Sequence, residues 1–187
     1  MNGSLTTYIA LLRAVNVGGK RKVAMADLRG MLGELGFGDS RSLLQSGNLV
    51  FCYAGRDTGH IGTRLEAATL ERLGLKTTYF VRSAAEWDEA VTSNPFPQAA
   101  VDDPAHLVMM ALRDSPPPEA VERLRSTIAG REVVEVIGRQ AYLIYPDGIG
   151  TSKLTLNVVE SKLGTRGTAR NWNTVLKLQA LTAELNV

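Results

Sequence analysis

The segment RSLLQSGNLVFCY, residues 41–53, decides the fold of this chain. It consists of two β-rich pieces on either side of Ser46-Gly47-Asn48. Glycine and asparagine favour the backbone conformations of tight turns, so the segment predicts two antiparallel strands joined in a hairpin. The elements before and after this hairpin then identify the sheet to which it belongs.

Before the hairpin, residues 7–15 (TYIALLRAV) form a short apolar run that predicts a buried strand. An amphipathic helix follows and ends at Gly36, because apolar residues recur at spacings of three and four. These residues are Met25, Leu28, Leu32 and Leu35.

After the hairpin, apolar residues at helical spacing predict a second helix that ends near Gly74. Residues 76–81 (KTTYFV) predict a strand, and residues 83–91 predict a short helix that the NPFP sequence at 94–97 terminates. The resulting order is strand, helix, hairpin, helix and strand, which is the ferredoxin-like plan.

Much of this plan then starts again. Residues 106–112 predict a strand, 116–130 a helix, 132–146 a hairpin turning at Gly138, and 151–164 a helix. A closing strand is not expected, since residues 168–185 predict a last helix instead. The repeat is one of architecture and not of sequence.

We therefore expect an α+β fold with two ferredoxin-like (βαββα) halves packed into one compact protein. The N-terminal half comprises residues 1–93, and residues 94–104 form a connector. The C-terminal half comprises residues 105–187 and includes the extra C-terminal helix.

The composition is that of an ordinary soluble globular protein, with 44% hydrophobic and 21% charged residues. No stretch approaches the roughly 18 apolar residues that span a bilayer, and the N-terminus lacks the pattern of a signal peptide. We expect a cytoplasmic protein without membrane association. The lone Cys52 excludes an internal disulfide, and His60 and His106 lack His or Cys partners at ligand spacing. No metal and no cofactor is predicted.

Positive charge is concentrated in two segments, although the whole chain carries only +2. Residues 148–177 hold five basic residues against Glu160, and Arg13 with residues 20–22 (KRK) holds four without an acid. Concentrated charge indicates an anionic partner more than evenly distributed charge does. Nucleic acid is one such partner, but the sequence pI of about 8.8 is low for that class, so a phosphate-bearing small molecule is an equal expectation.

Two turns that contain glycine could bind such an anion. Residues 16–22 (NVGGKRK) lead from a strand into a helix, where backbone N–H groups, the helix dipole and lysines favour phosphate. Residues 148–153 (GIGTSK) form a similar turn in which Thr151 or Ser152 would cap the helix. Lys153 would then oppose the dipole of that helix unless an anion lies between them. Neither turn has the spacing of a P-loop, and an exposed basic turn without a ligand fits the first as well.

The last predicted helix presents a polar, basic stripe, since Arg170, Asn173, Thr174 and Lys177 recur at spacings of three and four. Trp172 lies on a neighbouring face, where core packing is its expected use. An exposed Trp172 would instead suit stacking on a nucleic-acid base.

Five segments resemble the bacterial domain-of-unknown-function family DUF1697. They are YIALLRAVNVGGKRKVAMADLRGMLGELGF, LLQSGNLVF, NPFP, YPDGIGTSKLT and TARNWNTVLKL. The chain departs from the family pattern at Ala14-Val15, where LRGINVGG has Gly-Ile. The resemblance implies two ferredoxin-like halves and no established activity, cofactor or catalytic residue.

These observations favour a protein that binds an anionic ligand through a basic site. An enzyme acting on a phosphorylated or carboxylated small molecule is an alternative, for which the sequence offers charge stabilisation but no evident general base. A protein-interaction module is a second alternative. The expected ligand-binding residues are Arg13, Asn16, Gly18, Gly19, Lys20, Lys22, Ser46, Asn48, Ser152, Lys153, Thr155, Arg170, Asn171 and Asn173.

Overall fold

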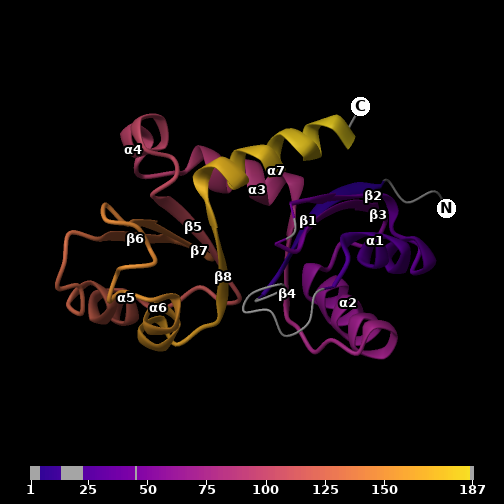
Figure 1. Ribbon diagram of the computed structural model, residues 1–187, viewed down its shortest axis with the longest axis horizontal. Coiled ribbons are helices and arrows are strands. Elements are labelled where there is room, and N and C mark those ends of the chain that lie inside the picture. Colours follow the sequence, from indigo (N-terminus) through magenta and orange to yellow (C-terminus); the bar gives the residue numbers. More distant parts are fainter. Residues whose placement is uncertain (1–4, 14–22, 45, 186–187) are drawn as a thin grey trace. The chain divides into compact units, whose positions relative to one another are not determined.

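The structure is a computed structural model that describes residues 5–13, 23–44 and 46–185. The chain forms two compact units (Figure 1). The first comprises Met1–Glu89 together with Lys177–Val187, and the second comprises Ala90–Leu176. Each unit contains one four-stranded sheet in which neighbouring strands are antiparallel. The protein thus has an α+β fold with two similar halves, as the sequence predicts.

The first unit has the strand order β2-β3-β1-β4, which is the ferredoxin-like order. Its elements are β1 (Thr6–Leu12), α1 (Met25–Glu34), β2 (Gly38–Leu43), β3 (Asn48–Tyr53), α2 (Thr58–Leu73), β4 (Tyr79–Ser83) and most of α3 (Ala84–Thr92). Both helices of the predicted motif end at a glycine with positive φ: Gly36 follows α1, and Gly74 caps α2. The predicted hairpin is β2–β3, and Gly47 in its turn also has positive φ.

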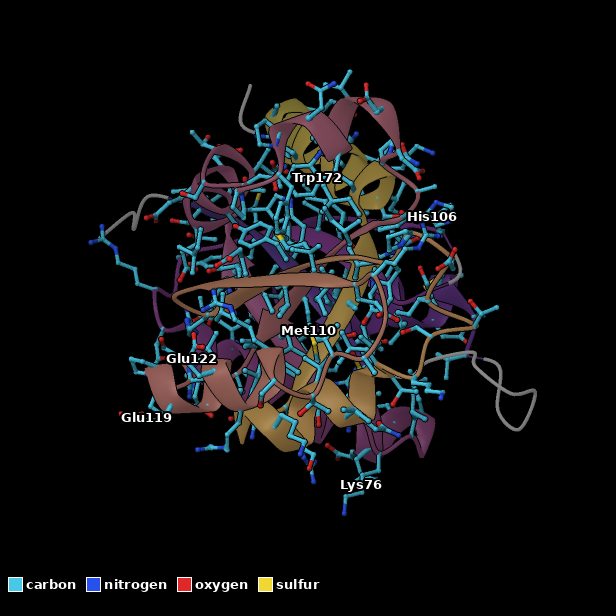
Figure 2. The ribbon with its side chains drawn as sticks, turned by 90° about the vertical axis from the view of Figure 1, so that its left-hand side faces the viewer. Lys76, His106, Met110, Glu119, Glu122 and Trp172 are labelled. Carbon is cyan, nitrogen blue, oxygen red and sulfur yellow. The ribbon has the colours of Figure 1, made fainter. Side chains whose placement is uncertain are left out.

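The second unit repeats this order as β6-β7-β5-β8. Its elements are α4 (Pro97–Asp102), β5 (Leu107–Leu112), α5 (Pro118–Arg125), β6 (Val133–Ile137), β7 (Gln140–Ile144), α6 (Leu156–Leu163), β8 (Gly167–Asn171) and the first turn of α7 (Trp172–Leu185). Figure 2 shows Met110 inside this unit, whereas Glu119 and Glu122 lie on the outer side of α5. The helix α4 lies within residues 94–104, the segment that the sequence predicts as a connector.

The prediction that the second half lacks its closing strand is wrong, because β8 pairs with β5 from Gly167 opposite Leu112 to Asn171 opposite Val108. The sequence of this strand, GTARN, is short and contains no large apolar residue, so hydrophobic alternation could not reveal it. Tertiary pairing with the fully buried β5 determines its conformation instead.

The two halves correspond even in individual hydrogen bonds. The N–H of Arg13 donates to the carbonyl oxygen of Thr78 at 3.0 Å, and the N–H of Arg113 donates to that of Arg166 at 2.8 Å. Each bond joins the end of the first strand of a half to the residue just before its last strand. The architectural repeat predicted from the sequence therefore extends to backbone contacts.

The end of α7 belongs to the first unit and not to the second, in which the helix begins. Glu184 accepts a hydrogen bond from Arg41 of β2 at 2.7 Å, and Gln179 donates one to Asp88 of α3 at 2.9 Å. These polar contacts connect residues that are 143 and 91 positions apart in the chain.

Candidate functional site

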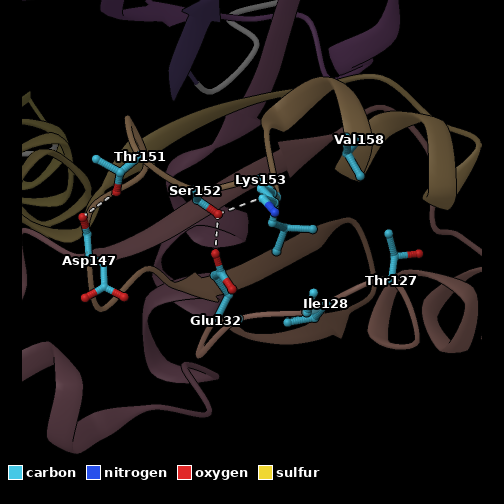
Figure 3. A pocket seen from close by; sticks show the side chains of 11 residues that line it. Thr127, Ile128, Glu132, Asp147, Thr151, Ser152, Lys153 and Val158 are labelled. Carbon is cyan, nitrogen blue, oxygen red and sulfur yellow. Dashed lines mark hydrogen bonds between the residues drawn. The ribbon is translucent and has the colours of Figure 1, made fainter.

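A cavity of about 390 Å³ lies in the second unit (Figure 3). Two loops enclose it: residues 127–132 connect α5 to β6, and residues 147–154 precede α6. Val158, in the first turn of α6, completes the lining. Its volume lies in the range of pockets that hold small molecules. Two of the predicted ligand-binding residues, Ser152 and Lys153, line it.

Hydrogen bonds within the second loop fix its path. The hydroxyl of Thr151 donates to the carbonyl oxygens of Asp147 at 2.7 Å and of Gly148 at 3.1 Å. The buried hydroxyl of Tyr145 donates to the carbonyl oxygen of Leu154 at 3.0 Å. Burial raises the pKa of Tyr145, so this hydroxyl stays protonated and remains a donor at neutral pH.

The helix that follows the loop begins later than predicted. Thr155 caps it, accepting a hydrogen bond from the N–H of Val158 at 3.3 Å. The expectation that Thr151 or Ser152 is the N-cap is wrong, because the chain between Gly148 and Leu154 folds into turns. Lys153 therefore lies outside the first helical turn, and its charge is not evidence of an anion at the helix dipole.

Ser152 instead connects the two loops. Its hydroxyl donates to Oε1 of Glu132, and its oxygen accepts the N–H of Leu154 at 2.9 Å (Figure 3). The hydrogen bond from Ser152 lowers the pKa of Glu132, which is therefore ionised at neutral pH. The second lining carboxylate, Asp147, forms an ion pair with Arg131.

Lys153 supplies the positive charge of the cavity lining. Its side chain is exposed, and within the described ranges no carboxylate forms an ion pair with it. Apolar contacts come from Ile128, Leu154 and Val158, which also belong to or pack against the core of the second unit. The cavity lining thus combines the ammonium of Lys153, the carboxylate of Glu132 with its hydrogen bond from Ser152, and an apolar wall.

The corresponding position in the first unit carries an aromatic side chain. Phe37 immediately precedes β2, as Glu132 immediately precedes β6. The ring of Phe37 packs against Tyr53 with a centroid distance of 4.6 Å, and the guanidinium of Arg64 lies 5.1 Å from its centroid. The two halves therefore share a backbone plan but differ at this position, where the first has a packed aromatic ring and the second a carboxylate.

Five predicted ligand-binding residues lie outside the described residues: Asn16, Gly18, Gly19, Lys20 and Lys22. The other three of the first unit lie near the β2–β3 turn or at the end of β1. Asn48 is fully buried, and its amide donates to the carbonyl oxygen of Leu43 at 2.9 Å and to the hydroxyl of Ser46 at 2.8 Å. Arg13 accepts a bond from the hydroxyl of Thr77 through its carbonyl oxygen. Asn48 thus stabilises the hairpin.

Arg170 does not share the cavity with Lys153. Ala169 packs against the core beneath α5 and α6, so Arg170, its neighbour in β8, lies on the opposite face of the sheet. The guanidinium donates to the hydroxyl of Thr168 at 3.0 Å and to the carbonyl oxygen of Ala169 at 2.7 Å. Burial lowers the pKa of Arg170 to about 10, so it remains charged at neutral pH.

The three predicted residues at the start of α7 differ from one another in burial and in hydrogen bonding. Asn171 accepts hydrogen bonds from the N–H and the hydroxyl of Thr174, at 3.1 and 2.9 Å, and so caps the helix. Asn173 is exposed. Trp172 is only 3% exposed and contacts the ring of Tyr142, so it packs in the interior and is not available to stack on a base.

Glu132 is one of the cavity residues that sequence reasoning missed. The sequence predicts only that it begins a strand, because no local spacing connects it with Ser152, which lies 20 residues later. Only the pairing of β6 with β7 and the return of the chain toward α6 bring the two together.

The described part of the chain contains no group of three or more His, Cys, Asp or Glu side chains arranged to hold a metal ion. No helix within it is long and apolar enough to cross a membrane.

Comparison with known proteins supports the fold. The chain is similar to the solved structure of the conserved bacterial protein SP0830 from Streptococcus pneumoniae, with a TM-score of 0.69 and 21% sequence identity. The similarity covers 96% of this chain and 99% of that chain. No protein with a curated description matches. A family model described as "Protein of unknown function (DUF1697)" matches residues 5–142, which is most of the chain, and the chain therefore belongs to this family.

Proposed function

We propose that this protein binds a small molecule with a phosphate or carboxylate group in the cavity beside Lys153. The observation that carries the proposal is the exposed ammonium of Lys153 at an open cavity of about 390 Å³. A lysine binds phosphate as a point charge, and this one has no competing ion pair with a described carboxylate.

The rest of the lining restricts the ligand. The apolar wall of Ile128, Leu154 and Val158 favours a molecule with an apolar part. The ionised Glu132 favours a hydroxyl or amino group that donates a hydrogen bond. A sugar phosphate or a nucleoside monophosphate has this combination of groups.

A small ligand is favoured over a nucleic-acid polymer. The cavity volume suits a single small molecule. Arg170 lies on the other face of the sheet, and Trp172 is buried, so neither extends the cavity into a basic groove with a stacking surface.

Isothermal titration calorimetry tests the proposal with inorganic phosphate, sugar phosphates, nucleoside monophosphates and a single-stranded oligonucleotide. Lys153→Met is expected to weaken binding at least tenfold. The matched control is Lys162→Met, which removes a lysine from the last turn of α6 outside the cavity lining and is expected to leave affinity within twofold.

Apart from an absence of phosphate binding, two results would overturn the proposal. One is an affinity for the small phosphates that is unchanged in Lys153→Met. The other is saturable binding of the oligonucleotide alone with a steep dependence on salt, since counterion release identifies a polyanion site.

A further inference from the structure

The hydroxyl of Ser152 can form a further bond besides the two that connect the loops. A serine hydroxyl has one donor hydrogen and two acceptor lone pairs. In this structure the hydrogen points to Glu132, and one lone pair accepts the N–H of Leu154 at 2.9 Å. One lone pair of the oxygen is left for a further bond, and Ser152 lines the cavity.

The groups next to this oxygen are those that the transfer of a phosphoryl group to a serine hydroxyl requires. A carboxylate that already accepts the hydroxyl hydrogen can take the proton when the oxygen forms a new bond. Lys153, the adjacent lining residue, supplies a positive charge for phosphoryl oxygens. Serine, proton acceptor and cation thus occupy one small cavity (Figure 3).

We infer that Ser152 accepts a phosphoryl group from a phosphate ester bound in this cavity, with Glu132 as the proton acceptor. The inference rests on the proposed function, because Lys153 must first hold the phosphate. It also supplies the general base that the sequence does not reveal.

The step balances without a further reactant. Oγ of Ser152 forms a bond to phosphorus, and the bond between phosphorus and the ester oxygen breaks. The hydroxyl proton moves to Glu132 and then to the departing oxygen, which leaves as an alcohol. The products are a phosphoserine and that alcohol, and no group is oxidised or reduced.

The weak basicity of Glu132 is compatible with this step. The hydrogen bond from Ser152 holds its pKa below the ordinary value, so it is a weak base. Phosphoryl transfer has a loose transition state in which the nucleophile needs little activation, and carboxylates serve as proton acceptors in such reactions. Acyl transfer to serine would demand a stronger base.

A purely structural role for the Ser152–Glu132 contact is the competing explanation, and Glu132→Gln separates the two. The amide oxygen of glutamine can still accept the serine hydrogen, so the loop contact is kept. The amide cannot take the proton, so the transfer becomes slower.

The experiment uses the full chain and para-nitrophenyl phosphate, a phosphate ester whose leaving group is coloured. We expect an initial release of nitrophenolate and, by peptide mass spectrometry, one phosphoryl group on Ser152. Ser152→Ala abolishes both signals. Glu132→Gln slows them by about a hundredfold or more, the usual effect of losing a general base, while calorimetric affinity for inorganic phosphate stays within threefold. Ser161→Ala, which removes an exposed serine hydroxyl of α6 outside the cavity lining, is the control and reacts like the unmodified protein.

The outcomes distinguish the inference from the proposed function. If phosphate esters bind with dependence on Lys153 but Ser152 is never phosphorylated, the transfer is refuted and the binding function stands. Labelling of Glu132→Gln at the unmodified rate refutes the role of Glu132 as proton acceptor. If phosphates neither bind nor label the protein, both fail.

Discussion

Replacing Gly167 with alanine tests the position of β8, the strand that hydrophobic patterning did not reveal. A β-carbon at this residue would lie 2.6 Å from Cε and 3.0 Å from Cγ of Met110, and 2.8 Å from the carbonyl oxygen of Ala111. Ordinary carbon contacts are about 3.5–4.0 Å. Gly167 is not among the glycines with positive φ, so crowding and not backbone strain opposes the substitution.

The two contacts differ in how they can be relieved. The side chain of Met110 is flexible but fully buried, so it can move only by disturbing its neighbours. The carbonyl oxygen of Ala111 belongs to the central strand β5 and can move only with the backbone. Overpacking of this kind costs about 1–3 kcal/mol. In a chain of this length each kcal/mol lowers the Tm by roughly 2–4 °C.

Thermal unfolding followed by circular dichroism measures the effect. The matched control is Gly30→Ala in the interior of α1, where an added β-carbon meets no atom within 4 Å. Because alanine favours the helix by about 0.5–1 kcal/mol, this variant should be as stable as the unmodified protein or more stable. If Gly167→Ala also melts at the unmodified temperature, β8 does not lie against β5 as described.

Three further substitutions test individual side chains. Tyr79→Phe should reduce the loss of stability at alkaline pH, because burial raises the pKa of Tyr79 to about 12. The contribution of the protonated tyrosine to the free energy of unfolding is therefore complete below about pH 10 and disappears as the pH rises toward 12. Urea titrations of both proteins at pH 9 and 11 would detect the difference. Asn171→Ala should cost about 1 kcal/mol through loss of the α7 cap, whereas the exposed Asn173→Ala should change stability by less than about 0.5 kcal/mol in the same urea titration. Asn48→Ala should cost about 1–3 kcal/mol, because the part-buried carbonyl oxygen of Leu43 loses its side-chain donor; an unchanged midpoint of unfolding would show that water replaces the amide.

The sequence predicted most of the fold because local signals and tertiary structure agree. Gly36, Gly74 and Gly164 follow helices whose apolar spacing had already located them, and each has positive φ. The turn at Gly138 is also where expected, between β6 and β7. The exception, β8, has no apolar periodicity of its own, and its hydrogen-bonding partner is distant in the sequence.

The sequence predicted less of the candidate site than of the fold. Charge clustering identified Lys153, and the turn around it identified Ser152, but charge clustering also selected Arg170, which contacts its own strand. Asn171, another expected ligand-binding residue, caps its own helix. Residue type does not show on which face of a sheet a side chain lies when the strand itself is not recognised. Glu132 had no local signal, because its partner is reached only through the fold.

The return of α7 to the first unit affects how the chain folds during synthesis. Residues 90–176 emerge from the ribosome between Glu89 and Lys177, and at 5–20 residues per second this interval lasts roughly 4–17 s. Throughout it, β2 lacks the contact between Arg41 and Glu184, and α3 lacks the contact between Asp88 and Gln179. The first unit to be translated is therefore the last to be completed.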